Sequence, residues 1–219
     1  MKKIISFSLW GTSPKYTIGA IKNADLAKEI YPEWICRYYI GRSTPEDIIN
    51  ELKNKTNVEI IIMNEEGEWN SMFWRFFPAS ENDVDVMISR DCDSRLSQRE
   101  KLCVDEWIQS DKKFHCMIDH PFHGGIMGGM WGVKRGLISD IKILIDKWSK
   151  SNKWQTDQSF LNSIIAPIAF NNTMIHDSIG LKNFLSKRED YHFIGEIFDE
   201  NDQRHEQYCV LQLPEYKGL

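Results

Sequence analysis

The sequence is short of cysteine, of long apolar runs and of excess positive charge, and each shortage excludes a class of protein. Its five cysteines are scattered over 219 residues and form no Cys-x-x-Cys pair. We therefore expect neither a disulfide framework nor a thiolate zinc site, and a reducing compartment. The formal net charge is −5, from 27 basic and 32 acidic residues, which gives no sign of a nucleic-acid-binding surface or partner.

No apolar run is long enough to span a membrane. Lys2 and Lys3 before the apolar run 4–10 resemble the start of a signal peptide, but the run is short and no small-residue cleavage site follows it. With 42% hydrophobic residues, a chain of this length can bury one substantial core. We therefore expect one cytoplasmic domain that covers residues 1–219.

Predicted strands and helices alternate along the chain. Apolar or aromatic runs predict strands at 3–9, 34–40, 58–63, 84–89, 114–118 and 127–133. Capping residues and helical spacing predict helices near 14–30, 44–52, 70–77, 97–108, 138–148 and 156–165. The run 58–63 suggests a strand buried on both faces of a parallel sheet. The order predicts an α/β fold with a Rossmann-type, doubly wound mixed sheet, mostly parallel and flanked by helices, in which ligands bind at the carboxyl ends of the strands.

Asp91 and Asp93 directly follow the apolar run 84–89. Since the side chains of residues i and i+2 of a strand lie on the same face, we expect two carboxylates at the end of that strand. Such hard oxygen ligands suit Mn²⁺ or Mg²⁺, which also bind the phosphates of a substrate. The pair therefore predicts a site for a metal and a diphosphate. The alternative is a turn in which the aspartates accept hydrogen bonds from backbone N–H groups.

Three later segments could belong to the same site, although each also has an ordinary explanation. Five glycines lie between Gly124 and Gly132, and glycine in a strand indicates a bulge, a group close to the backbone, or tight packing. Their spacing fits neither a P-loop nor a dinucleotide-binding motif. Asp157 and Gln158 begin a predicted helix, where a carboxylate also compensates the helix dipole. His176 could bind a metal, but a lone histidine is more often an ordinary surface or core residue.

Three histidines near the middle of the chain offer a rival metal site. His115, His120 and His123 lie near Asp119 in the sequence, and the spacing of the last two histidines could suit zinc. Pro121 argues against a helical pair of ligands there, and no cysteine lies nearby at ligand spacing. We therefore expect Asp119 and His120 to contact an acceptor or donor sugar rather than zinc, because the segment leads into the Gly-rich run.

The four segments occur in the order found in nucleotide-sugar glycosyltransferases of the GT-A fold, notably the glycogenin-like retaining enzymes. The wider string RDCDSR…DEW…DHPFH…GGMWGVKRG…TDQSFL…HDS resembles more closely the small glycosyltransferases of chlorella-infecting viruses and related microbial proteins. The resemblance runs from Trp10 to Asp177, which is most of the chain. It implies a metal-dependent enzyme that moves a sugar from a nucleotide diphosphate donor, a UDP-sugar, to a glycan or glycoprotein acceptor.

The resemblance also implies roles for particular residues. Asp91, Asp93 and His176 would bind Mn²⁺ or Mg²⁺. The residues that would contact the nucleotide, the phosphates or the donor sugar are Ser8, Leu9, Trp10, Gly11, Tyr16, Arg75, Arg90, Cys92, Gly128, Gly129 and Lys182. Glycogenin-like enzymes often have a glycine three positions and a lysine six positions after the metal histidine. Here those positions hold Ile179 and Lys182, so only the lysine matches.

The catalytic candidates are Asp157, Gln158 and Asp119. We expect transfer with retention, in which Asp157 stabilises or attacks an oxocarbenium-like species. An inverting enzyme would instead need a general base on the acceptor hydroxyl, for which Asp119 or Asp157 could serve. One alternative is a nucleotidyltransferase that makes the nucleotide sugar, and the single glycine in residues 10–15 counts against it. Another is a non-catalytic sugar-nucleotide-binding module, and two intact metal carboxylates count against that.

Overall fold

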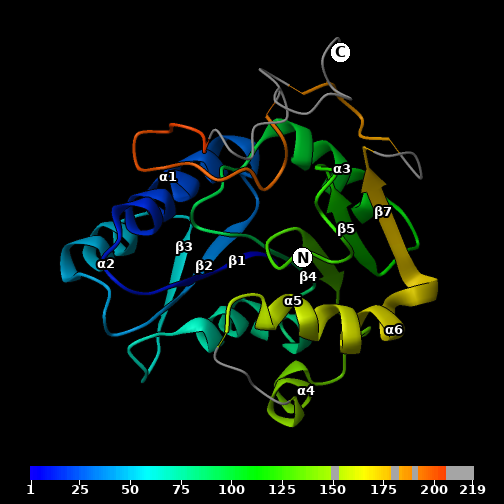
Figure 1. Cartoon of the computed structure of the whole chain (residues 1–219), viewed down its shortest axis with the longest axis horizontal. Coiled ribbons are helices and arrows are strands. Elements are labelled where there is room, and N and C mark those ends of the chain that lie inside the picture. The colour runs from blue at the N-terminus through cyan, green and yellow to red at the C-terminus, as the bar shows by residue number, and fades with distance from the viewer. Residues whose placement is uncertain (149–152, 179–182, 189–191, 206–219) are drawn as a thin grey trace.

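The computed structural model describes residues 1–148, 153–178, 183–188 and 192–205. Within these residues the sheet has seven strands in the order β3-β2-β1-β4-β6-β5-β7 (Figure 1). The strands are β1 (Lys3–Leu9), β2 (Ile35–Ile40), β3 (Val58–Ile62), β4 (Val86–Ser89), β5 (Phe114–Ile118), β6 (Trp131–Lys134) and β7 (Thr173–Asp177). Only β6 is antiparallel to its neighbours, β4 and β5. The predicted α/β fold with a mixed, mostly parallel sheet is confirmed.

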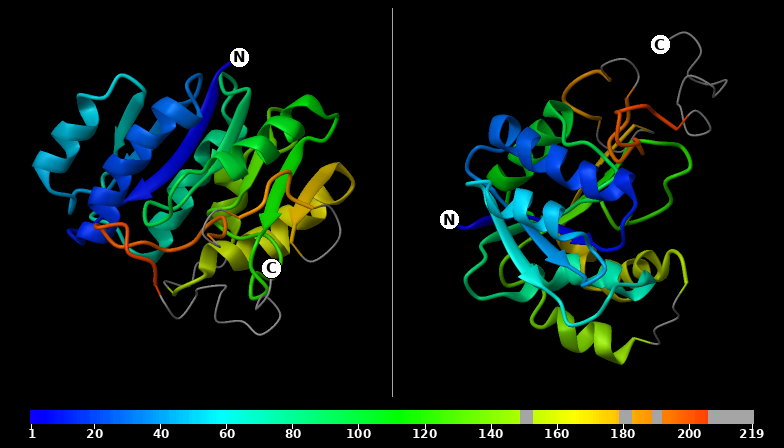
Figure 2. Two further views of the ribbon diagram at one scale, coloured as in Figure 1. Left: turned by 90° about the horizontal axis from the view of Figure 1, so that it is seen from above. Right: turned by 90° about the vertical axis from the view of Figure 1, so that its left-hand side faces the viewer.

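Helices cover both faces of this sheet. They are α1 (Pro14–Ile30), α2 (Glu46–Lys53), η1 (Trp69–Ser80), α3 (Gln98–Gln109), α4 (Ile141–Lys147), α5 (Thr156–Phe160), η2 (Leu161–Ile165), α6 (Ala166–Ala169) and η3 (Phe170–Asn172). Helices α1, α2 and α3 pack on one face, and η1, α4, α5 and α6 pack on the other (Figure 2). No helix in the described ranges is both long and apolar enough to cross a membrane.

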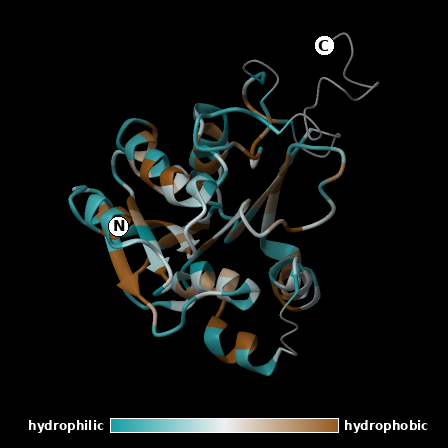
Figure 3. Ribbon diagram, turned by 60° about the vertical axis from the view of Figure 1, so that its left-hand side comes forward, coloured by the Kyte–Doolittle hydropathy of each residue, from teal (hydrophilic) through white to brown (hydrophobic). Residues whose placement is uncertain are grey.

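Two hydrophobic cores follow from the alternation of side chains along the strands. Ile5 of β1 belongs to the core under α1 and α3, which contains Trp107. The preceding residue, Ile4, points to the other face and belongs to the core under η1 and α5, with Phe73 and Phe160. In Figure 3, hydrophobic and polar segments alternate along the helices, as expected for helices with one face on a core. Burial of each side chain of this size stabilises the fold by roughly 1.5–3 kcal/mol. The two cores therefore hold the helices in place on the sheet.

Strand β3 lies at the edge of the sheet and is not buried on both faces. Ile61 and Ile62 are 37% and 50% exposed, and β2 is the neighbour with which β3 pairs. The expectation from the apolar run 58–63 was therefore wrong. Composition identified the strand, but its place in the sheet depends on pairing between distant segments.

The Gly-rich segment forms a strand only in its second half. Residues 127–130 make a turn, in which the Met130 N–H donates to the Met127 carbonyl at 3.1 Å, and β6 begins at Trp131. Because β6 is antiparallel to β4, with Trp131 opposite Ser89, this turn lies beside the carboxyl end of β4. Gly128 and Gly129 thus precede the strand instead of lying within it.

Candidate active site

Asp91 and Asp93 lie just beyond β4, at the carboxyl edge of the sheet. The Asp91 side chain is 39% exposed and that of Asp93 is 12% exposed. Burial raises the pKa of Asp93, and the negative charge of Asp91 raises it further, while Lys15 acts in the opposite direction. Two carboxylates that disfavour each other's charge at close range favour binding of a cation.

Lys15 joins this pair from the first turn of α1. Its Nζ lies 2.9 Å from Asp93 Oδ2. Lys15 was not predicted as a site residue, although its position after Pro14, in the helix that follows β1, places it at the carboxyl edge. It supplies one of the two positive charges that balance the aspartates.

Arg75 of η1 supplies the other charge and links Asp91 to Asp157 of α5. Its Nη1 donates to Asp91 Oδ1, and its Nη2 donates to Asp157 Oδ2 at 2.7 Å. Arg75 and Asp157 are buried, with 5% and 1% exposure. Burial raises the pKa of Asp157, and the Arg75 guanidinium opposes that rise. One arginine therefore connects the strand-end pair with the carboxylate of the later helix.

The backbone of Gly128 and Gly129 packs directly against this charged cluster. A Cβ atom on Gly128 would overlap Arg75 and Asp157, and one on Gly129 would overlap the Asp91 carboxylate. Of the explanations considered from the sequence, a group close to the backbone is the one observed. Any side chain at these positions would have to displace the carboxylates.

The end of β1 lies beside the same cluster. The Ser8 hydroxyl accepts a hydrogen bond from the Arg75 N–H at 3.0 Å. Gly11 has a φ of +74°, which favours glycine, and its N–H donates to Ser43 Oγ at 2.8 Å. Ser8 thereby holds the Arg75 backbone in place. Gly11 lets the chain turn from β1 toward α1.

Three neighbouring predicted residues differ in exposure. Tyr16 is 38% exposed, with Lys15 Nζ 4.6 Å from its ring centroid. Trp10 is half-buried and packs edge-on against Trp74. Leu9 is only 1% exposed and belongs to the core, so its side chain is not available to a ligand. The prediction for Leu9 is corrected.

Arg90 and Cys92 also face inward. Arg90 is 2% exposed and pairs with Glu100 of α3 at 3.2 Å. Cys92 is 3% exposed, and its thiol donates to the Ser8 carbonyl at 3.4 Å. Beyond β4 the chain makes a turn, in which the Ser94 N–H donates to the Asp91 carbonyl at 3.3 Å, and both neighbours of Asp91 face into the protein. The predicted ligand contacts of these two side chains were wrong.

His176 belongs to a different cluster. Its Nδ1 lies 2.8 Å from His115 Nε2, and its Nε2 lies 2.7 Å from Glu106 Oε2. Strands β6 and β5 lie between β4 and β7. At the usual interstrand spacing, β7 is therefore roughly 14 Å from β4. Both ring nitrogens have protein partners, His115 and Glu106, and the structure therefore does not bring His176 together with Asp91 and Asp93.

Asp119, at the end of β5, is saturated with hydrogen bonds. Arg99 Nη2 and Arg188 Nη2 donate to Oδ1 at 3.0 and 2.8 Å. Arg99 Nε and the Ile194 N–H donate to Oδ2 at 3.1 and 3.0 Å. Asp119 is 0% exposed, and a carboxylate held in this way cannot approach an acceptor hydroxyl as a base. Its predicted catalytic role was wrong.

The remaining candidates are Gln158 and Lys182. Gln158 is half-buried beside Asp157 in α5, and its carbonyl accepts a hydrogen bond from Asn162 Nδ2 at 2.8 Å. Helix α5 begins after Gln155, which has a φ of +64°, and so Thr156 is its first residue and not its cap. Lys182 lies outside the described residues.

Asp91 and Asp93 fit a hard divalent cation. No group of three or more His, Cys, Asp or Glu side chains in the described part of the chain is arranged to hold a metal, so the protein would supply two carboxylates. Mg²⁺ commonly binds proteins through one or two carboxylates, with water and substrate phosphates as the other ligands. Lys15 and Arg75 neutralise negative charge that a cation would also neutralise.

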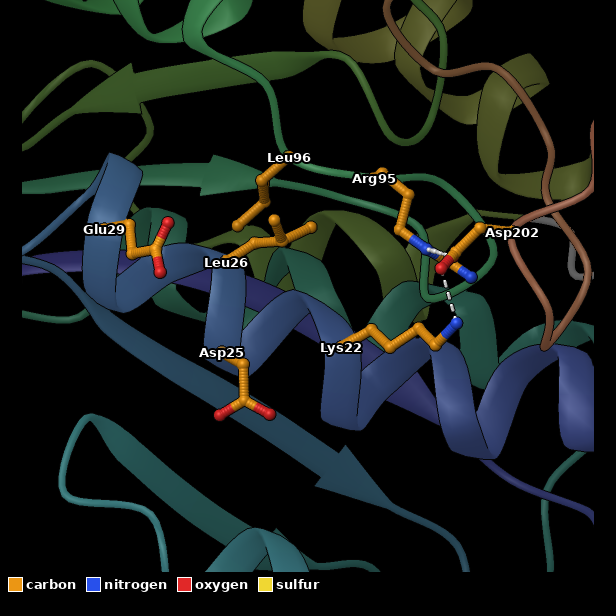
Figure 4. Close-up of a pocket in the computed structure, with 7 residues that line it drawn as sticks. All are labelled: Lys22, Asp25, Leu26, Glu29, Arg95, Leu96 and Asp202. Atoms are coloured by element: carbon orange, nitrogen blue, oxygen red, sulfur yellow. Dashed lines mark hydrogen bonds and ion pairs between the residues drawn. The ribbon is translucent and has the colours of Figure 1, made fainter.

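A separate open pocket of about 440 Å³ lies on the outer side of α1 (Figure 4). Its lining residues are Lys22, Asp25, Leu26, Glu29, Arg95, Leu96 and Asp202. None of the residues predicted to bind donor or metal lines it. Of the residues that follow Asp91 and Asp93, only Arg95 and Leu96 line this pocket. The active-site candidates therefore lie outside it.

Comparison with known proteins identifies the fold. No protein-family model matches the chain, and no curated protein sequence matches it. A glycosyltransferase involved in the glycosylation of the major capsid of PBCV-1 is 19% identical with a TM-score of 0.52, over 83% of this chain and 84% of that one.

Two further structures have similar scores. The 4-diphosphocytidyl-2C-methyl-D-erythritol synthase from Anaerococcus prevotii is 10% identical with a TM-score of 0.52, over 86% of this chain and 94% of that one. A protein named as a nucleotide-diphospho-sugar transferase from Desulfovibrio desulfuricans is 10% identical with a TM-score of 0.50, over 81% and 80%. The chain therefore has the GT-A, Rossmann-like fold of nucleotide-diphospho-sugar transferases.

Proposed function

We propose that the protein is a metal-dependent glycosyltransferase that moves a sugar from a UDP-sugar to a hydroxyl of a glycan or glycoprotein acceptor. One observation carries the proposal. Arg75 joins Asp91 of the strand-end pair to the buried Asp157, with Gly128 and Gly129 packed against all three. This cluster supports transfer from a metal-bound diphosphate, in which Asp91 would help to hold the cation and Asp157 would face the donor sugar.

Asp91 and Asp93 would hold Mn²⁺ or Mg²⁺ together with the diphosphate. When bound, the cation would neutralise the negative charge that develops on the departing nucleotide diphosphate. Tyr16, and the backbone from Ser8 to Gly11, would face the nucleotide, since they lie at the start of α1 and the end of β1. Lys182 remains a predicted phosphate contact.

Asp157 would act on the donor sugar. Its burial favours the neutral acid, and Arg75 opposes this by stabilising the carboxylate. A carboxylate held ionised in a buried place stabilises positive charge better than one in water. We propose that it stabilises an oxocarbenium-like sugar during transfer with retention. Gln158, next in the chain, would position the donor.

A nucleotidyltransferase is the alternative that shares this fold. Such an enzyme would need a Gly-rich, basic loop after β1 to bind a triphosphate. Here residues 10–15 contain one glycine, and the single lysine among them is paired with Asp93. These residues favour sugar transfer over nucleotidyl transfer, although the fold is compatible with both.

A panel of UDP-, GDP- and dTDP-sugars, with and without Mn²⁺, tests the proposal. We expect one UDP-sugar to raise the melting temperature only with Mn²⁺, since a ligand at 100 times its Kd stabilises by about 2.7 kcal/mol. We also expect slow release of UDP by hydrolysis. Stabilisation without turnover would indicate a binding module, and synthesis of a nucleotide sugar from UTP and a sugar phosphate would indicate the alternative enzyme. No metal-dependent effect from any sugar nucleotide would contradict the proposal.

A further inference from the structure

Helix α1 holds the segment that carries Asp91 and Asp93, residues 91–96, here named the metal loop. Asn23 of α1 is 0% exposed. Its Nδ2 donates to the Ser94 carbonyl at 2.8 Å and to the Cys92 carbonyl at 3.3 Å, and its Oδ1 accepts from the Leu96 N–H at 3.0 Å. One buried amide therefore satisfies three backbone groups of this loop.

Gly19, one helical turn before Asn23, brings α1 close enough for these bonds. A Cβ atom on Gly19 would overlap the Cys92 carbonyl oxygen. Glycine within a helix costs about 1 kcal/mol relative to alanine, so this position sacrifices helix stability. Close approach of the metal loop explains why it does so.

The opposite side of the metal loop is held from residues 198–202. The Phe198 N–H donates to the Asp93 carbonyl at 2.8 Å, and Arg95 Nη2 donates to the Asp199 carbonyl at 2.8 Å. Arg95 pairs with Asp202 at 2.8 Å, but the Asp202 side chain is 51% exposed, beside the open pocket of Figure 4. Exposed ion pairs contribute roughly 0–1 kcal/mol because solvent screens them. Asn23 differs from these contacts because it is a fully buried side chain that bonds three backbone groups of the loop at once.

We propose that Asn23 is a positioning residue for the metal site, acting through the backbone of Cys92 and Ser94. Cys92 lies between the two aspartates and Ser94 directly follows the second, so the bonds of Asn23 set how Asp91 and Asp93 present their carboxylates to one cation. The inference rests on the proposed function. Groups that orient metal ligands typically change metal affinity about 10- to 100-fold when they are mutated.

Asn23→Asp is the sharpest variant to test this. It keeps the acceptor for the Leu96 N–H, removes both donors, and places a carboxylate against two carbonyl oxygens. The added negative charge near the site would by itself strengthen cation binding. A loss of Mn²⁺-supported binding in this variant therefore reports displaced geometry, not altered charge.

Asn57→Ala serves as the matched control. Asn57 Nδ2 donates to the Ala24 carbonyl of the same helix at 2.8 Å, and no hydrogen bond in the described residues joins Asn57 to the metal loop. Each protein would be titrated with UDP, with and without Mn²⁺, by calorimetry, and unfolded in urea. Asn23→Asp should weaken Mn²⁺-supported UDP affinity about 10- to 100-fold and leave affinity without Mn²⁺ unchanged. Asn57→Ala should lower stability alone.

The outcomes separate this inference from the proposed function. A wild-type protein without Mn²⁺-dependent UDP affinity would overturn both. A wild-type protein that has it, with an equal affinity in Asn23→Asp, would overturn only the role of Asn23. If Asn23→Asp does not fold, Gly19→Ala decides, because alanine favours the helix yet must push the loop away. Unchanged Mn²⁺-supported affinity in Gly19→Ala would then contradict the inference.

Discussion

Two charged clusters lie at the carboxyl edge of the sheet, built from the same residue types but bonded to different degrees. Around Asp91 the carboxylates pair with the side chains of Lys15 and Arg75, and 39% of the Asp91 side chain stays exposed. Around Asp119, which is 0% exposed, two arginines and a backbone N–H bond both carboxylate oxygens. A strand-end aspartate is therefore a candidate for ligand binding only where the fold leaves it exposed, and residue type alone does not show this.

Removing Asp119 should have the largest effect on stability. Asp119→Ala leaves Arg99 and Arg188 without their buried partner, and breaking such a pair costs about 3–5 kcal/mol. Asp91→Asn should cost less stability than Asp119→Ala, because the Asp91 side chain is 39% exposed and the asparagine oxygen can still accept from Arg75. Urea unfolding measures both. Similar losses in the two variants would remove the distinction between the clusters.

Asp157→Asn should affect turnover more than stability, because the asparagine oxygen can still accept the hydrogen bond from Arg75 Nη2. Loss of one contact made in the transition state lowers turnover by about a hundredfold or more, while Mn²⁺-supported UDP affinity should persist. Asp140, whose side chain accepts from the Ile143 N–H at 3.1 Å at the start of α4, provides a control. Asp140→Asn should leave transfer intact. Near-normal transfer with lowered stability in Asp157→Asn would show that Asp157 only compensates the helix dipole and has no catalytic role.

His123, which lies near Asp119, should also make stability depend on pH. Burial, with a smaller contribution from His120, lowers the pKa of His123 to about 4, from an ordinary value of about 6.5. Between these values the unfolded chain binds more protons, so stability should fall as the pH drops from about 6.5 to about 4, by on the order of 2–3 kcal/mol.

Urea unfolding between pH 4 and pH 7 measures this effect. His123→Gln should flatten the dependence, because glutamine does not titrate. His205→Gln changes an exposed histidine and should leave the dependence as it is. The same slope in His123→Gln and the wild type would show that another group causes it.

The smallest effect is expected at Asp202, on the outer side of the metal loop. Asp202→Asn removes exposed ion pairs with Lys22 and Arg95, and asparagine tolerates the φ of +62° found there. Stability should change by less than about 1 kcal/mol, and Mn²⁺-supported UDP affinity should stay close to wild type. A loss as large as that expected for Asn23→Asp would show that the outer ion pairs, too, position the loop.

The sequence could predict the order of elements, because apolar runs and capping residues act locally. The resemblance to GT-A enzymes implied that Asp91, Asp157 and the two glycines belong to one site, and the structure brings them into contact. It could not predict that β6 inserts antiparallel between β4 and β5, because that pairing joins distant segments. The same pairing separates His176 from the aspartates.

The direction in which side chains point also could not be predicted from the sequence. The motif around Asp91 does not state which residues face inward. Arg90 and Cys92 do so through partners that are distant in the sequence, Glu100 of α3 and the Ser8 carbonyl. Asn23 was missed because a buried asparagine in a helix has no signal in the sequence until its partners are known. Lys15 could have been found from its place at the start of the first helix.

The central claim is that the cluster around Asp91 and Asp93, and not the one around His176, binds the metal with the nucleotide. Calorimetric titration of UDP in Mn²⁺ tests it on the wild type, Asp93→Asn and His176→Gln. We expect Asp93→Asn to weaken the Mn²⁺-dependent affinity by at least about tenfold, because an anionic ligand is lost, and His176→Gln to leave it unchanged. An unchanged affinity in Asp93→Asn, with a loss in His176→Gln, would contradict the account.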